Sequence, residues 1–110
     1  MLTPGPAKKL TIYLDESDRI HGKPVYEVLL DLFFKRKFAG ASVFRGIEGY
    51  GSHRVFHTAK ILELSTTLPV KVEVVDTAVK IDEILLEITP LVHKGLITVS
   101  DTQVIKSGAK

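Results

Sequence analysis

One segment constrains the fold of this chain more than any other, the run Val70-Lys-Val-Glu-Val-Val75 that follows Pro69. Its valines at positions 70, 72 and 74 alternate with Lys71 and Glu73. Successive side chains of a strand point to opposite faces of a sheet, so the run predicts a strand with one apolar and one charged face. Such a strand needs a core on one side only, which is typical of antiparallel sheets.

Helical and strand patterns flank this segment in a regular order. Before it, residues 10–14 alternate like a strand, residues 24–37 repeat apolar side chains like an amphipathic helix, and residues 41–47 form a second expected strand. After it come a second helix and a last strand over residues 96–105. The apolar stripes of the two expected helices are Val25, Val28, Leu29, Leu32 and Phe33 in the first, and Ile81, Ile84, Leu85 and Ile88 in the second.

The ends of the second helix are marked by capping and breaking residues. Asp76 or Thr77 can cap its first turn. Pro90 should end it near Thr89, because the proline ring clashes with the preceding turn. Gly95 is a further C-terminal stop signal.

The order β-α-β-β-α-β predicts an α+β, ferredoxin-like domain, with a four-stranded antiparallel sheet and two helices on one face. We divide the chain into a flexible N-terminal lead-in over residues 1–7, the domain over residues 8–106 and a tail over residues 107–110. The opposite sheet face has no element left to cover it, so it is either wet or a contact between subunits. Its expected residues are Thr11, Tyr13, Phe44, Lys71 and Glu73.

Composition excludes several classes of function. The 15 Lys and Arg against 13 Asp and Glu give a formal net charge of +2, which is too balanced for a nucleic-acid binder. There is no cysteine, so thiolate chemistry and disulfides are excluded. No apolar run approaches the roughly 18 residues that a membrane span needs, and the first nine residues lack the apolar core of a signal peptide. We expect a cytoplasmic protein without membrane insertion.

Few residues suggest catalysis or metal binding. His53 and His57 stand four apart, a spacing that suits zinc, but no third ligand accompanies them. Asp15, Glu16 and Asp18 form an acidic cluster that fits a polar turn better than acid–base work. No nucleophile elbow, Walker or dinucleotide motif is present. We therefore expect no catalytic residue, no metal site and no enzyme, and the identity of any cofactor stays open.

The most informative segment for function follows the second expected strand. Three glycines within six residues permit positive φ and close approach of a ligand's oxygen atoms to backbone N–H groups, and arginines at both ends can pair with phosphate or carboxylate. Residues 48–67 are also too apolar for a loop that makes no packing contacts, so part of them should form a strand or a short helix. The predicted ligand-binding residues are Arg45, Gly46, Gly49, Tyr50, Gly51, Ser52, His53 and Arg54. The alternative is a strand that ends in a bulge and a turn with surface arginines.

Five strings together resemble a known bacterial family: Lys9-Leu-Thr-Ile-Tyr-Leu-Asp-Glu16, Gly22-Lys-Pro-Val-Tyr26, Gly40-Ala-Ser-Val-Phe-Arg-Gly-Ile-Glu-Gly-Tyr-Gly51, Leu68-Pro-Val-Lys-Val-Glu-Val-Val-Asp76 and Gly95-Leu-Ile97. Over roughly residues 8–106 the chain resembles the PII-like family catalogued as domain of unknown function 190. That family is similar to the PII nitrogen-signalling proteins.

The resemblance implies a homotrimer with nucleotide sites in the clefts between subunits. It also implies a T-loop between the second and third strands that contacts a partner, with a membrane transporter as the partner class. Residues 49–53 match the base of that loop, and residues 52–67 take the place of the loop itself. The PII phosphate loop should carry several glycines and a lysine, whereas this chain offers only His93-Lys94-Gly95. We therefore expect weak ATP binding at best, and a small anion or a different nucleotide as the ligand.

The leading hypothesis is a PII-like regulatory protein that senses a small anion or nucleotide and contacts a partner through the loop after the second strand. Two alternatives stay open. One is a metal-dependent enzyme that uses His53, His57 and Glu16, and the other is a purely structural oligomer.

Overall fold

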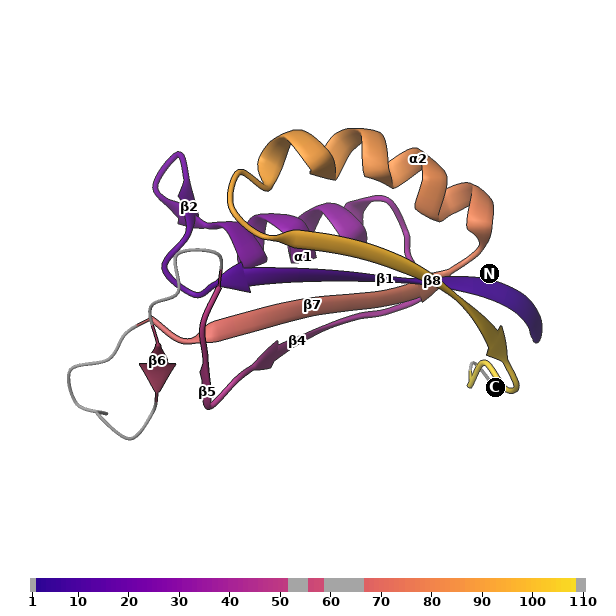
Figure 1. Ribbon diagram of the computed structural model, residues 1–110. Helices are drawn as coiled ribbons and strands as arrows, with labels where there is room; N and C mark the ends of the chain where they lie inside the picture. The colour runs from indigo at the N-terminus through magenta and orange to yellow at the C-terminus, as the bar shows by residue number, and fades with distance from the viewer. Residues whose placement is uncertain (1, 52–55, 59–66, 109–110) are drawn as a thin grey trace.

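The computed structural model describes residues 2–51, 56–58 and 67–108. Its main sheet has four strands, β1 (Gly5–Asp15), β4 (Ala41–Arg45), β7 (Pro69–Asp76) and β8 (Leu96–Val104). They lie in the order β4-β7-β1-β8, and every neighbouring pair is antiparallel (Figure 1). The predicted four-stranded antiparallel sheet is confirmed.

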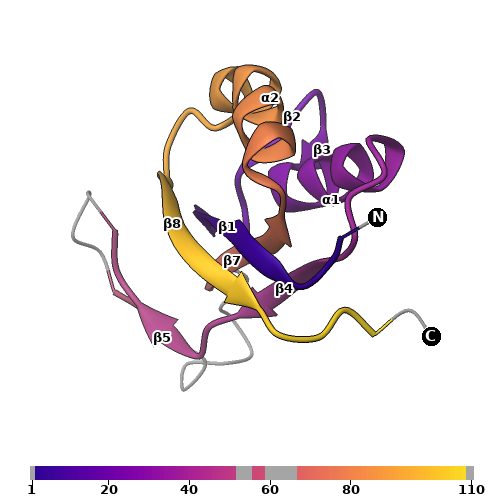
Figure 2. The same cartoon turned by 90° about the vertical axis from the view of Figure 1, so that its right-hand side faces the viewer.

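Two helices, α1 (Val25–Lys35) and α2 (Ala78–Ile88), lie on the same face of this sheet (Figures 1 and 2). With them the chain has the predicted ferredoxin-like βαββαβ plan. Two short two-stranded ribbons are added to that plan. The first consists of β2 (Arg19–Ile20) and β3 (Lys23–Pro24), and the second of β5 (Glu48–Gly49) and β6 (His57–Thr58).

The core lies between the helices and the sheet. The predicted alternation of β7 is confirmed, because Val70, Val72 and Val74 are buried while Lys71 and Glu73 are not. Burying each such side chain stabilises the fold by roughly 1.5–3 kcal/mol. The buried apolar cluster consists of Leu10, Ile12, Leu14, Val25, Leu29, Phe33, Val70, Val72, Val74, Ile81, Ile84 and Ile88.

Two of the three residues expected to mark the ends of α2 lie at those ends. The Thr77 side chain accepts a hydrogen bond from Lys80 N at 3.3 Å and so caps the first turn. The α-helix ends at Ile88, and a short 3-10 turn that contains Pro90 follows at Thr89–Leu91. Gly95 is not the stop signal of this helix, contrary to the expectation. It lies immediately before β8, at a position where a Cβ would lie 2.5 Å from the Tyr13 carbonyl oxygen.

Strand β1 begins at Gly5, earlier than expected, so residues 5–7 belong to the sheet rather than to a flexible lead-in. Pairing with β7 starts only at Lys8, whereas pairing with β8 starts at Gly5. Residues 5–7 are therefore bonded on one side only. A strand tolerates the missing N–H of Pro6 at such an edge.

An ion pair joins the two helices at the end of α1. The Arg36 guanidinium donates from Nε and Nη2 to the two carboxylate oxygens of Glu87, at 2.9 and 2.7 Å. This hydrogen bonding lowers the pKa of Glu87 below its ordinary value. The pair is solvent-exposed and links the end of α1 to α2.

No helix covers the opposite face of the sheet among the described residues (Figure 2). The register aligns four side chains across this face, in the order Phe44, Lys71, Tyr13 and Leu96. Phe44, Tyr13 and Leu96 are each about half exposed, and Lys71 Nζ lies 5.2 Å from the centroid of the Phe44 ring. We call this set the open-face row. Within the described part of the chain, no helix is long and apolar enough to span a membrane.

Candidate functional site

The predicted site lies where the crossover from β4 to β7 leaves and rejoins the sheet. The register places Arg45, the last residue of β4, opposite Val70. The next residue, Gly46, donates its N–H to the Pro69 carbonyl oxygen at 2.6 Å. The two ends of the crossover therefore meet, and we call Arg45, Gly46, Leu68 and Pro69 the crossover root.

Two of the three predicted glycines lie close to Pro69, where the chain ends meet. A Cβ on Gly46 would lie 2.9 Å from Pro69 Cγ, and one on Gly49 would lie 3.1 Å from the same atom. Gly51 has nothing within 4 Å. None of these three glycines adopts the positive φ that the sequence permits, since the glycines with positive φ are Gly5, Gly22 and Gly95. Gly46 and Gly49 instead let the chain approach Pro69.

The Glu16 carboxylate binds both ends of the crossover root. Its Oε1 atom accepts from Arg45 Nη2 at 3.0 Å and from the Leu68 N–H at 3.3 Å. The backbone N–H of Glu16 also donates to the Leu68 carbonyl oxygen at 2.8 Å. The Arg45 side chain is 57% exposed and that of Glu16 is 22% exposed, so an anion in solution can reach the guanidinium.

Beyond the root, the chain forms the ribbon of β5 and β6, with Glu48 opposite Thr58 and Gly49 opposite His57. This confirms strand within residues 48–67. Next to the ribbon, the rings of Tyr50 and Phe56 lie 4.9 Å apart between centroids, and both side chains are largely exposed. The crossover thus presents an aromatic pair to solvent close to its root.

Part of the predicted site falls outside the described residues. Ser52, His53 and Arg54 lie there, and so does one member of the histidine pair considered for zinc. Among the residues that the structure describes, no group of three or more His, Asp or Glu side chains is placed to hold a metal ion.

The acidic cluster after β1 forms a turn. Asp18 N–H donates to the Asp15 carbonyl oxygen at 3.0 Å, and the Asp18 carboxylate accepts from Asp15 N–H at 3.2 Å. This is the turn-forming role that aspartates commonly have. Glu16, between them, projects to the crossover root instead.

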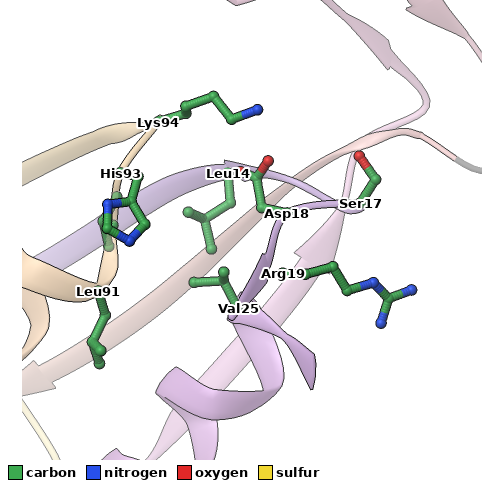
Figure 3. Close-up of a pocket in the computed structure, with 9 residues that line it drawn as sticks. Leu14, Ser17, Asp18, Arg19, Val25, Leu91, His93 and Lys94 are labelled. Atoms are coloured by element: carbon green, nitrogen blue, oxygen red, sulfur yellow. The ribbon is translucent and has the colours of Figure 1, made fainter. Parts of the chain in front are cut away.

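A cavity of about 210 Å³ lies between this turn and the loop before β8 (Figure 3). Leu14 and Val25 line it and point toward one another, whereas the guanidinium of Arg19 extends away from them (Figure 3). The loop before β8 is the segment that offers one glycine where a PII phosphate loop carries several. No cavity-lining residue was among the predicted ligand-binding residues, because two segments distant in sequence form the cavity. The lining is Leu14, Ser17, Asp18, Arg19, Val25, Leu91, Val92, His93 and Lys94.

Comparison with known proteins identifies the family. The family model DUF190, described as "Uncharacterized ACR, COG1993", matches residues 7–104. The chain belongs to this family. A UPF0166 protein of Aquifex aeolicus is 42% identical over 98 residues, which cover 89% of this chain and 92% of the relative. A UPF0166 protein of Methanocaldococcus jannaschii is 36% identical over 101 residues, which cover 91% and 93%.

Solved structures share the fold of this DUF190 chain. CPII, a nitrogen regulatory PII-like protein from Thiomonas intermedia K12 bound to ADP, AMP and bicarbonate, superposes with a TM-score of 0.70 at 21% identity, over 94% of this chain and 92% of that one. The apo form of CPII gives a TM-score of 0.62 at 18% identity, over 93% and 95%. The fold is therefore PII-like.

Proposed function

We propose that this protein is a PII-like regulatory protein that binds a small anion or nucleotide in clefts between its copies. The observation that carries the proposal is the crossover root, where the exposed guanidinium of Arg45 lies at the end of a strand and beside the return of the chain. A protein with the same fold, CPII, is bound to ADP, AMP and bicarbonate. A guanidinium suits phosphate and carboxylate oxygens equally well.

The assembly in this proposal is a homotrimer, and the open-face row supports contact between copies. Two aromatic side chains and a leucine stand on a sheet face that no described helix covers. Burying such a surface against other copies would add to the modest core of a 110-residue chain. Light scattering should give three times the 12.2 kDa chain mass.

The crossover after β4 is the proposed contact for a partner protein, with a membrane transporter as the class that the family resemblance implies. The exposed Tyr50–Phe56 pair supports this role. Aromatic side chains supply much of the binding energy in protein interfaces.

Calorimetry with ADP, AMP, bicarbonate and ATP tests ligand binding. We expect ADP or bicarbonate to bind wild type, ATP to bind weakly, and Arg45→Gln to weaken ADP binding by roughly 10- to 100-fold, because a hydrogen bond to a charged group contributes about 1.5–3 kcal/mol. Arg36→Gln is the matched control, since Arg36 pairs with Glu87 at the end of α1. Absence of binding by all four compounds would refute the proposal.

A further inference from the structure

The guanidinium proposed to bind the anion already has an anionic partner within the chain. Arg45 Nη2 donates to Glu16 Oε1 at 3.0 Å. An external phosphate or carboxylate offers the same kind of acceptor to the same donor. We propose that Glu16 is an internal competitor, which occupies Arg45 in the ligand-free protein and which an incoming anion must displace. This inference rests on the proposed function and assigns Glu16 a positioning role in it.

The hydrogen bonds favour Arg45, rather than Glu16, as the partner that moves during such an exchange. Glu16 is fixed to the return of the crossover twice, through its backbone N–H to the Leu68 carbonyl oxygen at 2.8 Å and through the Leu68 N–H to its own carboxylate at 3.3 Å. The Arg45 side chain is bonded to Glu16 through Nη2 and is the more exposed of the two. The guanidinium therefore swings to the anion while Glu16 stays on Leu68.

This exchange connects ligand binding to the crossover. Glu16 joins the side chain of Arg45, which ends β4, to the backbone of Leu68, which precedes β7. When Arg45 turns to an anion, that side-chain link between the two ends of the crossover is lost. The backbone bond from Gly46 to Pro69 keeps the root itself in place. Ligand binding therefore alters the side-chain contacts at the base of the crossover, which is the segment proposed to contact the partner.

The competitor is weak enough to be displaced. An ion pair as exposed as this one favours the state in which Arg45 is paired with Glu16 over the state in which Arg45 is released. The equilibrium constant between these two states is roughly 1.5–5. A binding-competent state that is only partly populated weakens the apparent affinity in proportion. Glu16 should therefore weaken anion binding by a factor of about two to six.

Two substitutions separate competition from simple charge repulsion. Glu16→Gln removes the charge but keeps an oxygen that can accept from Leu68. Glu16→Asp keeps the charge but shortens the side chain by one methylene, which withdraws the carboxylate from Arg45. Glu87→Gln is the matched control for loss of a negative charge, because Glu87 pairs with Arg36 on the helix layer.

Calorimetric titration with inorganic phosphate and with ADP provides the test. We expect both Glu16 variants to bind at least one probe about two- to sixfold more tightly than wild type, and Glu87→Gln to bind like wild type. The gain from Glu16→Gln should vanish in an Arg45→Gln background, as a double-mutant cycle requires for a contact pair. In wild type, the phosphate-induced shift of the Leu68 amide NMR signal should also disappear with Arg45→Gln.

The possible failures are distinguishable. If wild type and both Glu16 variants bind a probe with equal affinity, the competitor is refuted and the proposed function stands. If Glu16→Gln binds more tightly but Glu16→Asp does not, charge repulsion explains the gain and the competitor is again refuted. If no variant binds phosphate or ADP, the competitor is refuted, and the proposed function is refuted as well when AMP, bicarbonate and ATP also fail to bind wild type. Circular dichroism of each variant confirms that it is folded.

Discussion

At the crossover root, Gly46 lies so close to Pro69 that little room is left for a side chain. A Cβ at position 46 would lie 2.9 Å from Pro69 Cγ and 3.2 Å from the Pro69 carbonyl oxygen. Carbon atoms in contact prefer about 3.5–4.0 Å, so Gly46→Ala creates an overlap of more than half an ångström. The oxygen involved belongs to the backbone bond that closes the root. Relief of the overlap must therefore displace the chain.

Overpacking of this kind costs about 1–3 kcal/mol. For a chain of 110 residues this corresponds to a fall in Tm of about 4–13 °C. Gly51→Ala is the matched control, because Gly51 has nothing within 4 Å and no positive φ. That substitution should leave Tm unchanged or raise it slightly through a less flexible unfolded chain.

Differential scanning calorimetry at one fixed protein concentration measures both variants. A second background sharpens the result, since Pro69→Ala removes the Cγ atom and should recover part of the loss caused by Gly46→Ala. Equal Tm values for Gly46→Ala and Gly51→Ala would refute the reasoning. Full destabilisation of Gly46→Ala in the Pro69→Ala background would show that the Cγ contact is not the cause.

Three further predictions concern the fold around the site. Phe33→Ala should lower the free energy of unfolding by about 3–5 kcal/mol, because Phe33 is fully buried against the sheet. Urea denaturation measures this loss, and a value below about 1 kcal/mol would contradict the assigned core. Asp76→Ala should lower the free energy of unfolding by about 2–3 kcal/mol, because the buried carboxylate accepts from Ala39 N–H at 3.0 Å and from Thr77 N–H at 2.8 Å. Asp101→Ala is the control, and it should change the free energy of unfolding far less because the Asp101 side chain is 85% exposed. Hydrogen bonding to Arg36 lowers the folded-state pKa of Glu87 below its ordinary value, so the stability from this pair is present above the ordinary pKa and is lost as pH falls through the lower folded pKa. The urea midpoint of Glu87→Gln should fall less steeply than that of wild type between about pH 5 and pH 3, and parallel curves would exclude this contribution.

Most of the fold could be predicted because side-chain periodicity is a local signal. The valine alternation in β7 and the apolar stripes of both helices each span two or more turns or pleats. The ribbon of β2 and β3 could not be predicted, since strands of two residues carry no periodicity. The start of β1 at Gly5 was hidden by Pro6, which ordinarily argues against a strand and is tolerated here on a one-sided edge.

The site was predictable only in its local part. The sequence indicated Arg45 and the glycines, because their types and spacing lie in one short segment. It did not indicate that Gly46 meets Pro69, or that Arg45 pairs with Glu16, 29 residues earlier. The bond from Leu68 to Glu16 spans 52 residues. Contacts between segments so distant depend on how the sheet orders its strands, and no local pattern encodes that.

Native mass spectrometry in the presence of ADP records assembly and ligand occupancy together. We expect a trimer of the 12.2 kDa chain that carries ADP, and a trimer of Arg45→Gln that has lost most of it at the same concentration. A wild-type chain that stays monomeric and carries no ADP at millimolar concentration would refute both the proposed assembly and the proposed nucleotide site.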